Sequence, residues 1–572
     1  MTFWCVAFGV KTLAVRPRSD GGISSFASDT LASGSAILHA PGMREWISGL
    51  RFWPSLGVAA TSSVLIGLGA PPQGWIPGEW LGFVPLILMV RRPSVTRRQA
   101  FILGWVGGLG IGLVGFPWIA EMLVRFAGLP WVLAWVGLFA FSAWMAIPYG
   151  LFGLGLRWGP QRGAGSWAWP VLLFPALMFV WPNLFPYTPL LGFAEYPPLM
   201  QAAEWIGVHG LEALVVGWAV CAARLLTGPG SPVLPACVVV LLPLLLVVAG
   251  QQRIQTLETR MAASPTLKVG LVQPNVPPGG GTARDRLERL WRVSAKLEEQ
   301  GAQLLVWPEA GAYPYLLPRS HAQDGDLGDA AVLGRHRLPT LFGAGSRERG
   351  APFGFNSFYF VDPDGAVRGR YDKVNRVPFG EAIPLVDPDW VSEQIPYVRH
   401  LYAGAGPEVF EVDLVSSPKT VRVGPLICYE DILPGFVGEL AARPGGVELF
   451  VNGTIDAWYG YGSEPWEHLA LAQFRSVEHR IPLARSTTTG VSAVVDAAGR
   501  IQDWLPVRPV EPETLADYPS EGLLVEVALL RNTAAKPTPY ARWGWFFPYA
   551  CVGSVFGVVL YSRLGSRFTE ES

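Results

Sequence analysis

Charged residues are scarce in this chain, and the two signs nearly cancel. Of its 572 residues, 44 are Lys or Arg and 45 are Asp or Glu, together 16% of the sequence, and the formal net charge is −1. Soluble domains usually contain about 25% charged residues, and proteins that bind nucleic acid collect basic residues on one face. Because half of the residues are hydrophobic, the composition predicts a membrane protein and gives no indication of nucleic-acid binding.

Cysteine is also scarce, with five in the whole chain. Cys221, Cys237 and Cys551 fall in long apolar stretches, and Cys5 lies near the start, so Cys428 stands alone in the polar part. It has no partner for a disulfide there and no companions for a zinc site. Cys428 is therefore either a buried small hydrophobe or a reactive thiol. Phosphate-binding and zinc motifs are missing as well, so we expect no cofactor and no metal.

Seven apolar stretches lie in the first 250 residues, and an eighth lies at about 543–562. The seven cover residues 55–70, 76–91, 100–123, 129–156, 167–186, 201–226 and 232–250. A helix needs about 20 apolar residues to cross a hydrocarbon core of about 30 Å. The sequence therefore predicts about eight transmembrane helices: about seven in an N-terminal bundle over residues 43–250 and one at 541–565, on either side of a polar segment at 251–540.

Basic residues gather in alternate loops, which is a signal of topology. They are Arg91, Arg92, Arg97, Arg98, Arg157, Arg162, Arg224, Arg563 and Arg567. Short loops rich in Lys and Arg stay in the cytoplasm, so we expect both termini and the tail 566–572 to be cytoplasmic and segment 251–540 to lie across the membrane. Residues 1–42 fit neither part, and we expect a disordered leader or a start codon that belongs at Met43.

The polar segment alternates short β-rich runs with helical patterns. The β-rich runs are 267–273, 302–309, 340–346, 357–362, 421–430, 447–454, 483–490 and 491–496. Helical patterns occupy 283–302 and 464–480, and "DPDG" (362–365) and "DAAG" (496–499) are typical of hairpin turns. This order predicts one layered α/β domain. His468 and His479 lie eleven residues apart on the second helical pattern, too far to share a metal, and we expect them on the surface.

Side chains that could react follow or lie within β-rich runs. "LLVWPEAG" presents Glu309, "YDKVNRVPFGE" presents Lys373 and then Glu381, and "LICYEDILP" presents Cys428. Open α/β sheets usually gather their reacting groups at strand ends. A thiol needs a base or a nearby cation to become a thiolate, and Glu309 and Lys373 are suited to supply them.

The motifs "WPE", "YDK…VPFGE" and "CYED", in this order, resemble the Glu-Lys-Cys site of the nitrilase, or carbon-nitrogen hydrolase, superfamily. Together with the membrane stretches on both sides, they resemble the bacterial apolipoprotein N-acyltransferase family over nearly all of the chain from Met43. The resemblance implies an αββα sandwich domain on the periplasmic side of the inner membrane.

The resemblance also implies an activity. Cys428 would take the sn-1 acyl chain of a phospholipid as a thioester and pass it to the α-amine of a diacylglyceryl-modified apolipoprotein, the last step of lipoprotein maturation. Glu309 would be the general base, and Lys373 with a backbone N–H would hold the oxyanion. Glu381 and Glu430 match acidic positions of the family site; the alternative for each is a solvated carboxylate. Tyr429 would shape the acyl pocket or pack in the core. The chain is expected to act as a monomer.

Two other functions stay open on the sequence. A membrane-tethered amidase would use water in place of the amine, and a receptor would use the domain as a non-catalytic binding module. Positions 455, 488 and 376 depart from the family pattern, with Ile, Thr and Arg respectively, and leave the substrate-covering loops in question. Aromatic residues at 311–318, 395–402 and 456–466 predict a mobile lid over Cys428 that reaches the lipid headgroups; packing of each loop in the core is the alternative.

Overall fold

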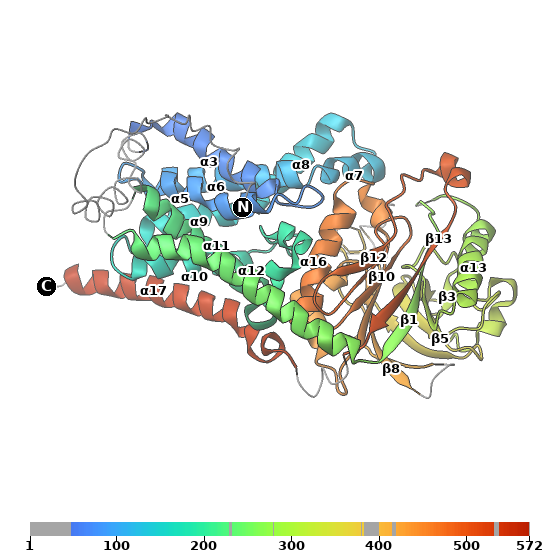
Figure 1. The fold of residues 1–572 in the computed structure, drawn as a ribbon. Coiled ribbons are helices and arrows are strands. Elements are labelled where there is room, and N and C mark those ends of the chain that lie inside the picture. Colours follow the sequence, from blue (N-terminus) through green and yellow to red (C-terminus); the bar gives the residue numbers. More distant parts are fainter. Residues whose placement is uncertain are drawn as a thin grey trace, which may run out of the picture.

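The computed structural model describes residues 47, 49–227, 231–277, 279–378, 380–382, 390, 400–414, 419–530 and 537–570. A helical bundle and an α/β domain lie side by side along the length of the molecule (Figure 1). The leader expected at 1–42 lies outside the described residues.

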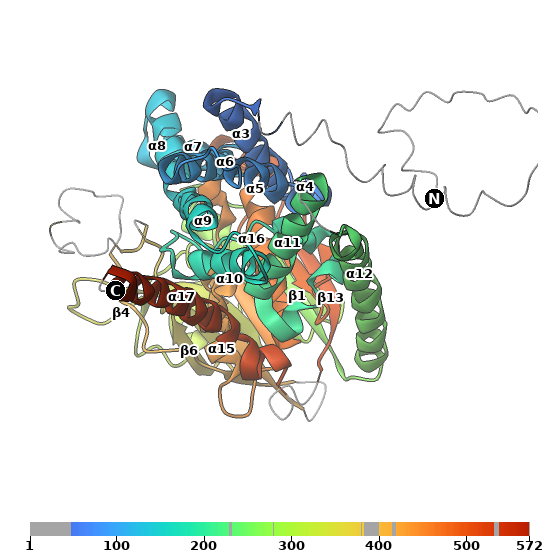
Figure 2. The same cartoon turned by 90° about the vertical axis from the view of Figure 1, so that its left-hand side faces the viewer.

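The bundle is built from apolar helices. They are α3 (Phe52–Gly67), α4 (Ile76–Leu81), α5 (Phe83–Val90), α6 (Arg97–Gly115), α7 (Trp118–Ala127), α8 (Trp131–Met145), α9 (Ile147–Trp158), α10 (Gly165–Val180), α11 (Ala203–Thr227), α12 (Val233–Ala262) and, after the α/β domain, α17 (Phe546–Glu570). Figure 2 views the bundle end-on, with α17 and α12 on its outside.

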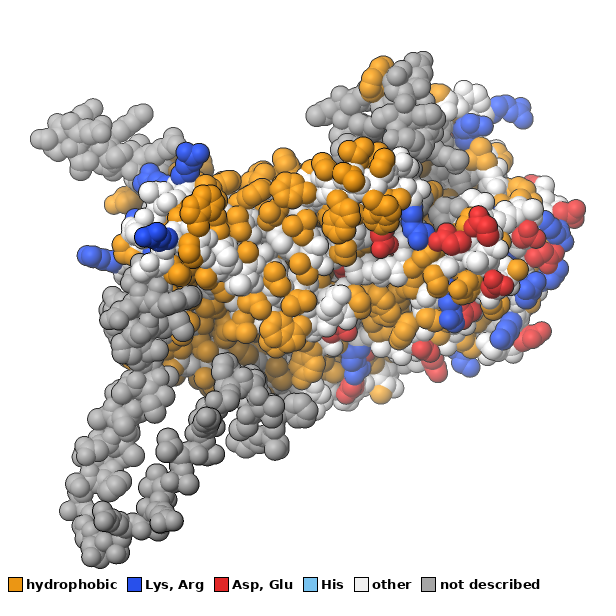
Figure 3. Space-filling view, turned by 90° about the horizontal axis from the view of Figure 1, so that it is seen from above, with side chains coloured by type: hydrophobic (Ala, Val, Ile, Leu, Met, Phe, Trp, Pro, Cys, Tyr) orange, Lys and Arg blue, Asp and Glu red, His pale blue; other side chains and the backbone are white. Residues whose placement is uncertain are grey.

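Among the described residues, five segments are long and apolar enough to cross a membrane. They are Arg97–Gly115, Trp131–Trp158, Ala203–Thr227, Val233–Ala262 and Tyr540–Tyr561. Three shorter apolar helices cover Phe52–Gly67, Ile76–Val90 and Gly165–Val180, so each of the eight predicted stretches overlaps an apolar helix. A broad band of hydrophobic side chains crosses the helical part, with charged groups at its two ends (Figure 3). The chain is a multi-pass membrane protein.

The stretch predicted at 100–123 is not one helix. Helix α6 ends at Gly115 and α7 begins at Trp118, because Pro117 disfavours a helical conformation at Phe116 and has no N–H to continue the helix. Helix α7 then lies against the α/β domain, where the Trp118 indole N–H donates to Glu467 Oε2 at 3.0 Å. Helix α12, in contrast, continues unbroken past residue 250 to Ala262 and leads into the α/β domain.

The α/β domain contains two mixed sheets. The first has the order β13-β1-β2-β4-β5-β6, with β3 paired to β4. Its strands are β1 (Thr266–Gln273), β2 (Leu304–Val306), β3 (Leu317–Pro318), β4 (Thr340–Arg347), β5 (Phe355–Val361), β6 (Val367–Asp372) and β13 (Glu521–Ala528). The second has the order β12-β11-β10-β9-β8-β7. Its strands are β7 (Phe410–Asp413), β8 (Thr420–Ile427), β9 (Leu449–Thr454), β10 (Leu483–Thr487), β11 (Ala493–Val495) and β12 (Ile501–Trp504).

Helices cover the outer faces of both sheets, which gives an αββα sandwich and confirms the predicted fold class. Apolar side chains of the two sheets meet in one buried core. Helix α13 (Ala283–Glu299) packs on the first sheet, and α16 (Glu464–His479) covers the second (Figure 1). Helix α15 (Pro434–Ala441) packs against the second sheet as well. Every predicted β-rich run contains a strand, and both predicted hairpins join antiparallel neighbours.

Helix α16 lies between the second sheet and the membrane bundle. Its Glu478 Oε1 accepts from the Val208 N–H of α11 at 3.3 Å, and Arg480, directly after it, pairs with Glu204 of α11 at 2.9 Å. The expectation that His468 and His479 lie on the surface is wrong: they are 6% and 4% exposed. Both faces of the helix are covered, which an isolated helical pattern does not reveal.

Candidate active site

Three strand ends bring the predicted reactive side chains together. Glu309 lies three residues beyond β2, Lys373 directly follows β6, and Cys428 directly follows β8. Their exposures are 4%, 1% and 4%. Lys373 Nζ lies 3.4 Å from Glu309 Oε1, and the charges of both groups act on the Cys428 thiol. Because β2 and β6 belong to the first sheet and β8 to the second, the site forms where the ends of the two sheets meet.

A second carboxylate and an amide complete the surroundings of Lys373. Lys373 Nζ lies 2.9 Å from Glu381 Oε2. The Asn356 Nδ2 group donates to Glu309 Oε1 at 2.7 Å and to Glu381 Oε1 at 2.9 Å, so one amide fixes both carboxylates. Sequence reasoning missed Asn356, because it sits at the start of β5 and an asparagine in a strand gives no signal of its own.

The two carboxylates differ in their ionisation. Burial raises the pKa of Glu309, Lys373 lowers it and Glu381 raises it again, and the net direction is upward. Burial also raises the pKa of Glu381, but Lys373 and the Val377 N–H outweigh it, and the net direction is downward. Burial lowers the pKa of Lys373, whereas Glu381 and Glu309 hold it well above its usual range. Glu381 is thus the stable partner of the ammonium, and Glu309 is the stronger base.

Cys428 occupies a strained backbone position with φ of +53°, a region rare for residues other than glycine. Burial and Glu309 raise the pKa of its thiol, Lys373 and His468 lower it, and the net result is a pKa of about 12. The resting thiol is therefore protonated and needs a base to become a nucleophile. The Asn452 Nδ2 group donates to the Cys428 carbonyl at 2.8 Å, which fixes the backbone at this residue.

Glu430 is not a solvated carboxylate, because it is fully buried. Its Oε1 accepts from the N–H groups of Val374 and Asn375, both at 2.9 Å, and its Oε2 accepts from the Tyr371 hydroxyl at 2.7 Å and the Ile427 N–H at 3.0 Å. One side chain therefore ties the backbone that follows Lys373 to the backbone that precedes Cys428.

Tyr429 lines the same region from the other side. Its ring is partly exposed, and Lys373 Nζ lies 5.8 Å from the ring centroid. Its hydroxyl donates to the Arg376 carbonyl at 3.2 Å, and the Arg376 guanidinium donates to the Leu401 carbonyl at 2.9 Å. Arg376, one of the departures from the family pattern, thus connects the segment after Lys373 to a distant loop.

Two of the predicted aromatic loops, 311–318 and 456–466, place some side chains in the core and others on the surface. In the first, Tyr313 is 2% exposed and Leu316 is 54% exposed. In the second, Trp458 is 42% exposed, whereas the Tyr459 ring packs edge-on against Trp118 of α7 at 5.2 Å. Residues 395–399 of the third loop lie outside the described residues. The mobile lid stays a prediction.

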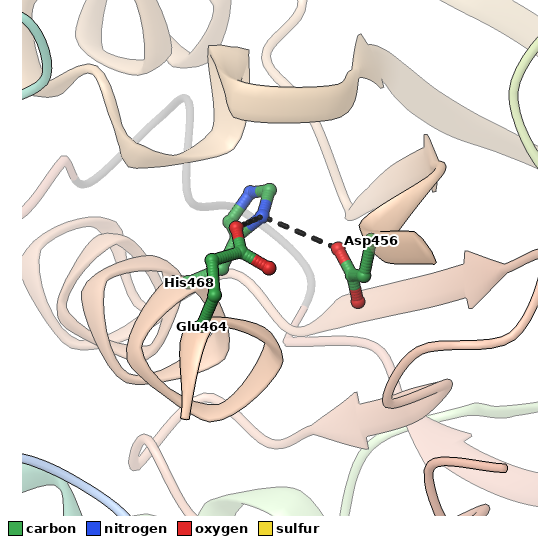
Figure 4. Close-up of side chains that lie close together, drawn as sticks. All are labelled: Asp456, Glu464 and His468. Atoms are coloured by element: carbon green, nitrogen blue, oxygen red, sulfur yellow. Dashed lines mark ion pairs between the residues drawn. The ribbon is translucent and has the colours of Figure 1, made fainter. Parts of the chain in front are cut away.

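A second cluster of buried charges lies beside the nucleophile. Asp456, Glu464 and His468 place donor atoms within 4.8 Å of one another (Figure 4), close enough to share one cation. The chain itself supplies a cation at this cluster, because the Arg485 guanidinium pairs with both Asp456 oxygens, at 2.6 and 2.9 Å. We therefore interpret the cluster as an ion-pair network. Sequence reasoning missed it, because Asp456, Arg485 and the α16 pair of Glu464 and His468 come from three separate elements.

Known protein families match both parts of the chain. The model of the carbon-nitrogen hydrolase family matches residues 268–506, and that of the apolipoprotein N-acyltransferase N-terminal domain matches residues 62–221. Among solved structures, an amidase from Nesterenkonia sp. aligns with 48% of this chain and 92% of its own, at 21% identity and a TM-score of 0.33.

Full-length relatives are found in several bacteria. The apolipoprotein N-acyltransferase of Geobacter metallireducens is 30% identical over 537 residues, which cover 89% of this chain and 95% of that protein. The apolipoprotein N-acyltransferase of Bradyrhizobium diazoefficiens is 33% identical over 392 residues, 64% of this chain and 66% of that protein. The likeness runs through the membrane bundle and the α/β domain alike, and the chain belongs to the apolipoprotein N-acyltransferase family.

Proposed function

We propose that this protein transfers the sn-1 acyl chain of a phospholipid to the α-amine of the S-diacylglyceryl-cysteine that begins an apolipoprotein, through a thioester on Cys428. In the first half, Cys428 Sγ attacks the ester carbonyl while Glu309 accepts the thiol proton. The ester C–O bond then breaks, and Glu309 returns the proton to the departing lysophospholipid. In the second half, the amine attacks the thioester and Glu309 takes a proton from nitrogen; the C–S bond then breaks, and Glu309 returns this proton to the Cys428 sulfur, which restores the thiol and the base.

Lys373 and a backbone N–H near Cys428 would stabilise the oxyanion of each tetrahedral intermediate. Glu381 and Asn356 would keep Lys373 and Glu309 in place, Glu430 would fix the spacing of the two strand ends, and Tyr429 would border the acyl chain. An acyl-enzyme suits two bulky lipid substrates, because they need not occupy the site together. The single observation that supports this proposal most strongly is the buried convergence of Glu309, Lys373 and Cys428, in which Glu381 satisfies the ammonium and leaves Glu309 as a base.

We also propose that the α/β domain faces the periplasm across the inner membrane, with both termini in the cytoplasm, and that the protein acts as a monomer. Basic side chains from separate helices meet at the end of the bundle away from the α/β domain. Arg91 and Arg224 both bond to Ser166, at 2.7 and 2.5 Å, and Arg157 donates to the Val95 carbonyl at 2.7 Å. Such a basic end belongs in the cytoplasm. All three proposed catalytic groups come from one chain, so no second copy is required.

Mass spectrometry of the protein incubated with phospholipid and no acceptor tests the thioester. An acyl mass should appear on Cys428, hydroxylamine should remove it, and Cys428→Ala should not acquire it. A diacylglyceryl-cysteine peptide added afterwards should gain the acyl group on its amine. Release of free fatty acid in place of N-acyl peptide would favour the amidase-like alternative. Absence of acyl mass, with Glu309→Ala as active in cells as the unchanged protein, would favour a binding module.

A further inference from the structure

His468 of α16 lies beside the turn that carries Cys428. That turn, η4 (Cys428–Ile432), also carries Asp431, whose Oδ1 lies 2.8 Å from His468 Nε2. The other ring nitrogen, Nδ1, lies 3.4 Å from Asp456 Oδ1 and 3.5 Å from Glu464 Oε1. Figure 4 shows the imidazole between these last two carboxylates. The ring thus contacts carboxylates from the nucleophile turn, from η5 (Asp456–Tyr459) and from its own helix.

Arg485 of β10 is the second cation of this network. It pairs with Asp456, and its Nε lies 3.7 Å from Asp431 Oδ2. His468 is 6% exposed, Arg485 is fully buried, and none of the three carboxylates is more than 7% exposed. Two cations and three carboxylates are therefore enclosed together, and water contributes little to screening their charges.

The surrounding groups determine the charge of the imidazole. Burial and Arg485 lower the pKa of His468, but Asp431 and Asp456 outweigh them and hold it well above its usual range. Burial raises the pKa of Asp456, but Arg485 and His468 lower it to about 2. Burial raises the pKa of Glu464 to about 7. The cluster at neutral pH thus contains an imidazolium whose field reaches the Cys428 thiol.

Lys373 lowers the pKa of the Cys428 thiol more than His468 does, but its charge is shared with Glu381 and Glu309. Glu309 itself disfavours a second negative charge nearby. An additional positive charge beside the nucleophile turn offsets part of this repulsion. His468 is so placed, since it holds Asp431 of that turn.

We propose that His468 is a positioning residue for acyl transfer: as a buried imidazolium it anchors the nucleophile turn through Asp431 and favours the thiolate form of Cys428. This inference rests on the proposed role of Cys428 as nucleophile. It goes beyond the Glu-Lys-Cys set, because His468 acts on the thiol and not on the substrate.

The test measures the thiol and not the transfer reaction. Alkylation of Cys428 by iodoacetamide is followed by peptide mass spectrometry from about pH 6 to about pH 10, because its rate reports the thiolate fraction. The variant His468→Gln keeps a hydrogen-bond donor for Asp431 but removes the charge. A rise of one pKa unit in the thiol lowers the thiolate fraction about tenfold, so His468→Gln should be alkylated about tenfold more slowly at each pH. If this variant is not recovered folded, His468→Asn reports the same loss of charge.

Two controls separate charge from shape. His468→Lys keeps a positive charge among the same carboxylates and should restore most of the rate. His479→Gln removes another buried histidine of α16, one that packs on Phe450 and Tyr540, and should leave the rate unchanged. The proposal is overturned if His468→Gln matches the unchanged protein, if His468→Lys is as slow as His468→Gln, or if His479→Gln is equally slow. Because no lipid is present, a missing acyl-enzyme would count against the proposed function and not against this inference.

Discussion

Replacing Glu430 with alanine should separate the two strand ends that carry Lys373 and Cys428. The carboxylate accepts four hydrogen bonds. Tyr371, Val374 and Asn375 donate from β6 and the segment after it, and Ile427 donates from the end of β8. Alanine removes all four acceptor contacts inside a fully buried site. At about 1 kcal/mol per hydrogen bond, the free energy of unfolding should fall by about 4 kcal/mol.

Glutamine at the same position should cost less. Its carbonyl oxygen can accept from Val374 and Asn375, and its amide can donate to the Tyr371 oxygen. Only the Ile427 N–H then faces a donor, so we expect a loss of about 1 to 2 kcal/mol. For a domain of this size, each kcal/mol shifts the melting temperature by about 2 to 4 °C. The expected shifts are therefore about 8 to 16 °C for Glu430→Ala and about 2 to 8 °C for Glu430→Gln.

Tryptophan fluorescence during heating of the purified protein in detergent measures both shifts, and formation of acyl-Cys428 measures the consequence for the site. Glu439→Ala is the matched control, because Glu439 is exposed on the neighbouring helix α15 and should change stability by no more than about 0.5 kcal/mol. Equal shifts for the alanine and glutamine variants would refute the hydrogen-bond reasoning. An alanine variant with the same melting temperature as the unchanged protein would also refute it.

Three further outcomes follow from the same structure. Lys373→Met should lower the rate of acyl-Cys428 formation about 10²- to 10³-fold, the usual effect of losing one oxyanion donor; a variant of unchanged rate in a single-turnover assay would exclude that role. Burial raises the pKa of Glu467 from its ordinary 4.5 to about 8, so the stability that this group contributes below about pH 4.5 is lost progressively between about pH 4.5 and about pH 8. Relative to Glu467→Gln, the unchanged protein should lose up to about 1.4 kcal/mol per pH unit in this window, and parallel melting curves against pH would contradict it. Arg480→Met should destabilise the protein by about 3 to 5 kcal/mol, because it leaves Glu204 without one of its buried partners; Arg162→Met, at an exposed position, is the control in the same thermal assay.

Strand and helix patterns in the polar segment could be predicted because each depends on local periodicity. The β-rich runs, the two long helical patterns and both hairpins are present in the structure. Among the described residues, five strands lie outside the predicted runs. Strands β3, β7 and β12 have two to four residues, which give too little pattern. Strands β6 and β13 are longer and were missed as well. The break between α6 and α7 was missed because hydropathy alone ignores what Pro117 does to the backbone.

The sequence by itself determined the composition of the molecule and the order of its parts along the chain. These parts are an apolar bundle and a polar α/β segment with Glu309, Lys373 and Cys428 at strand ends. Those features follow from residue type and spacing, which are local. Only the tertiary structure decided that Glu381 pairs with Lys373 and that Asn356 donates to both Glu309 and Glu381. It also decided that Glu430 ties two sheets together and that His468 is buried beside the nucleophile turn. Hydrogen bonds and ion pairs between distant segments depend on how sheets and helices pack, and no local pattern encodes that packing.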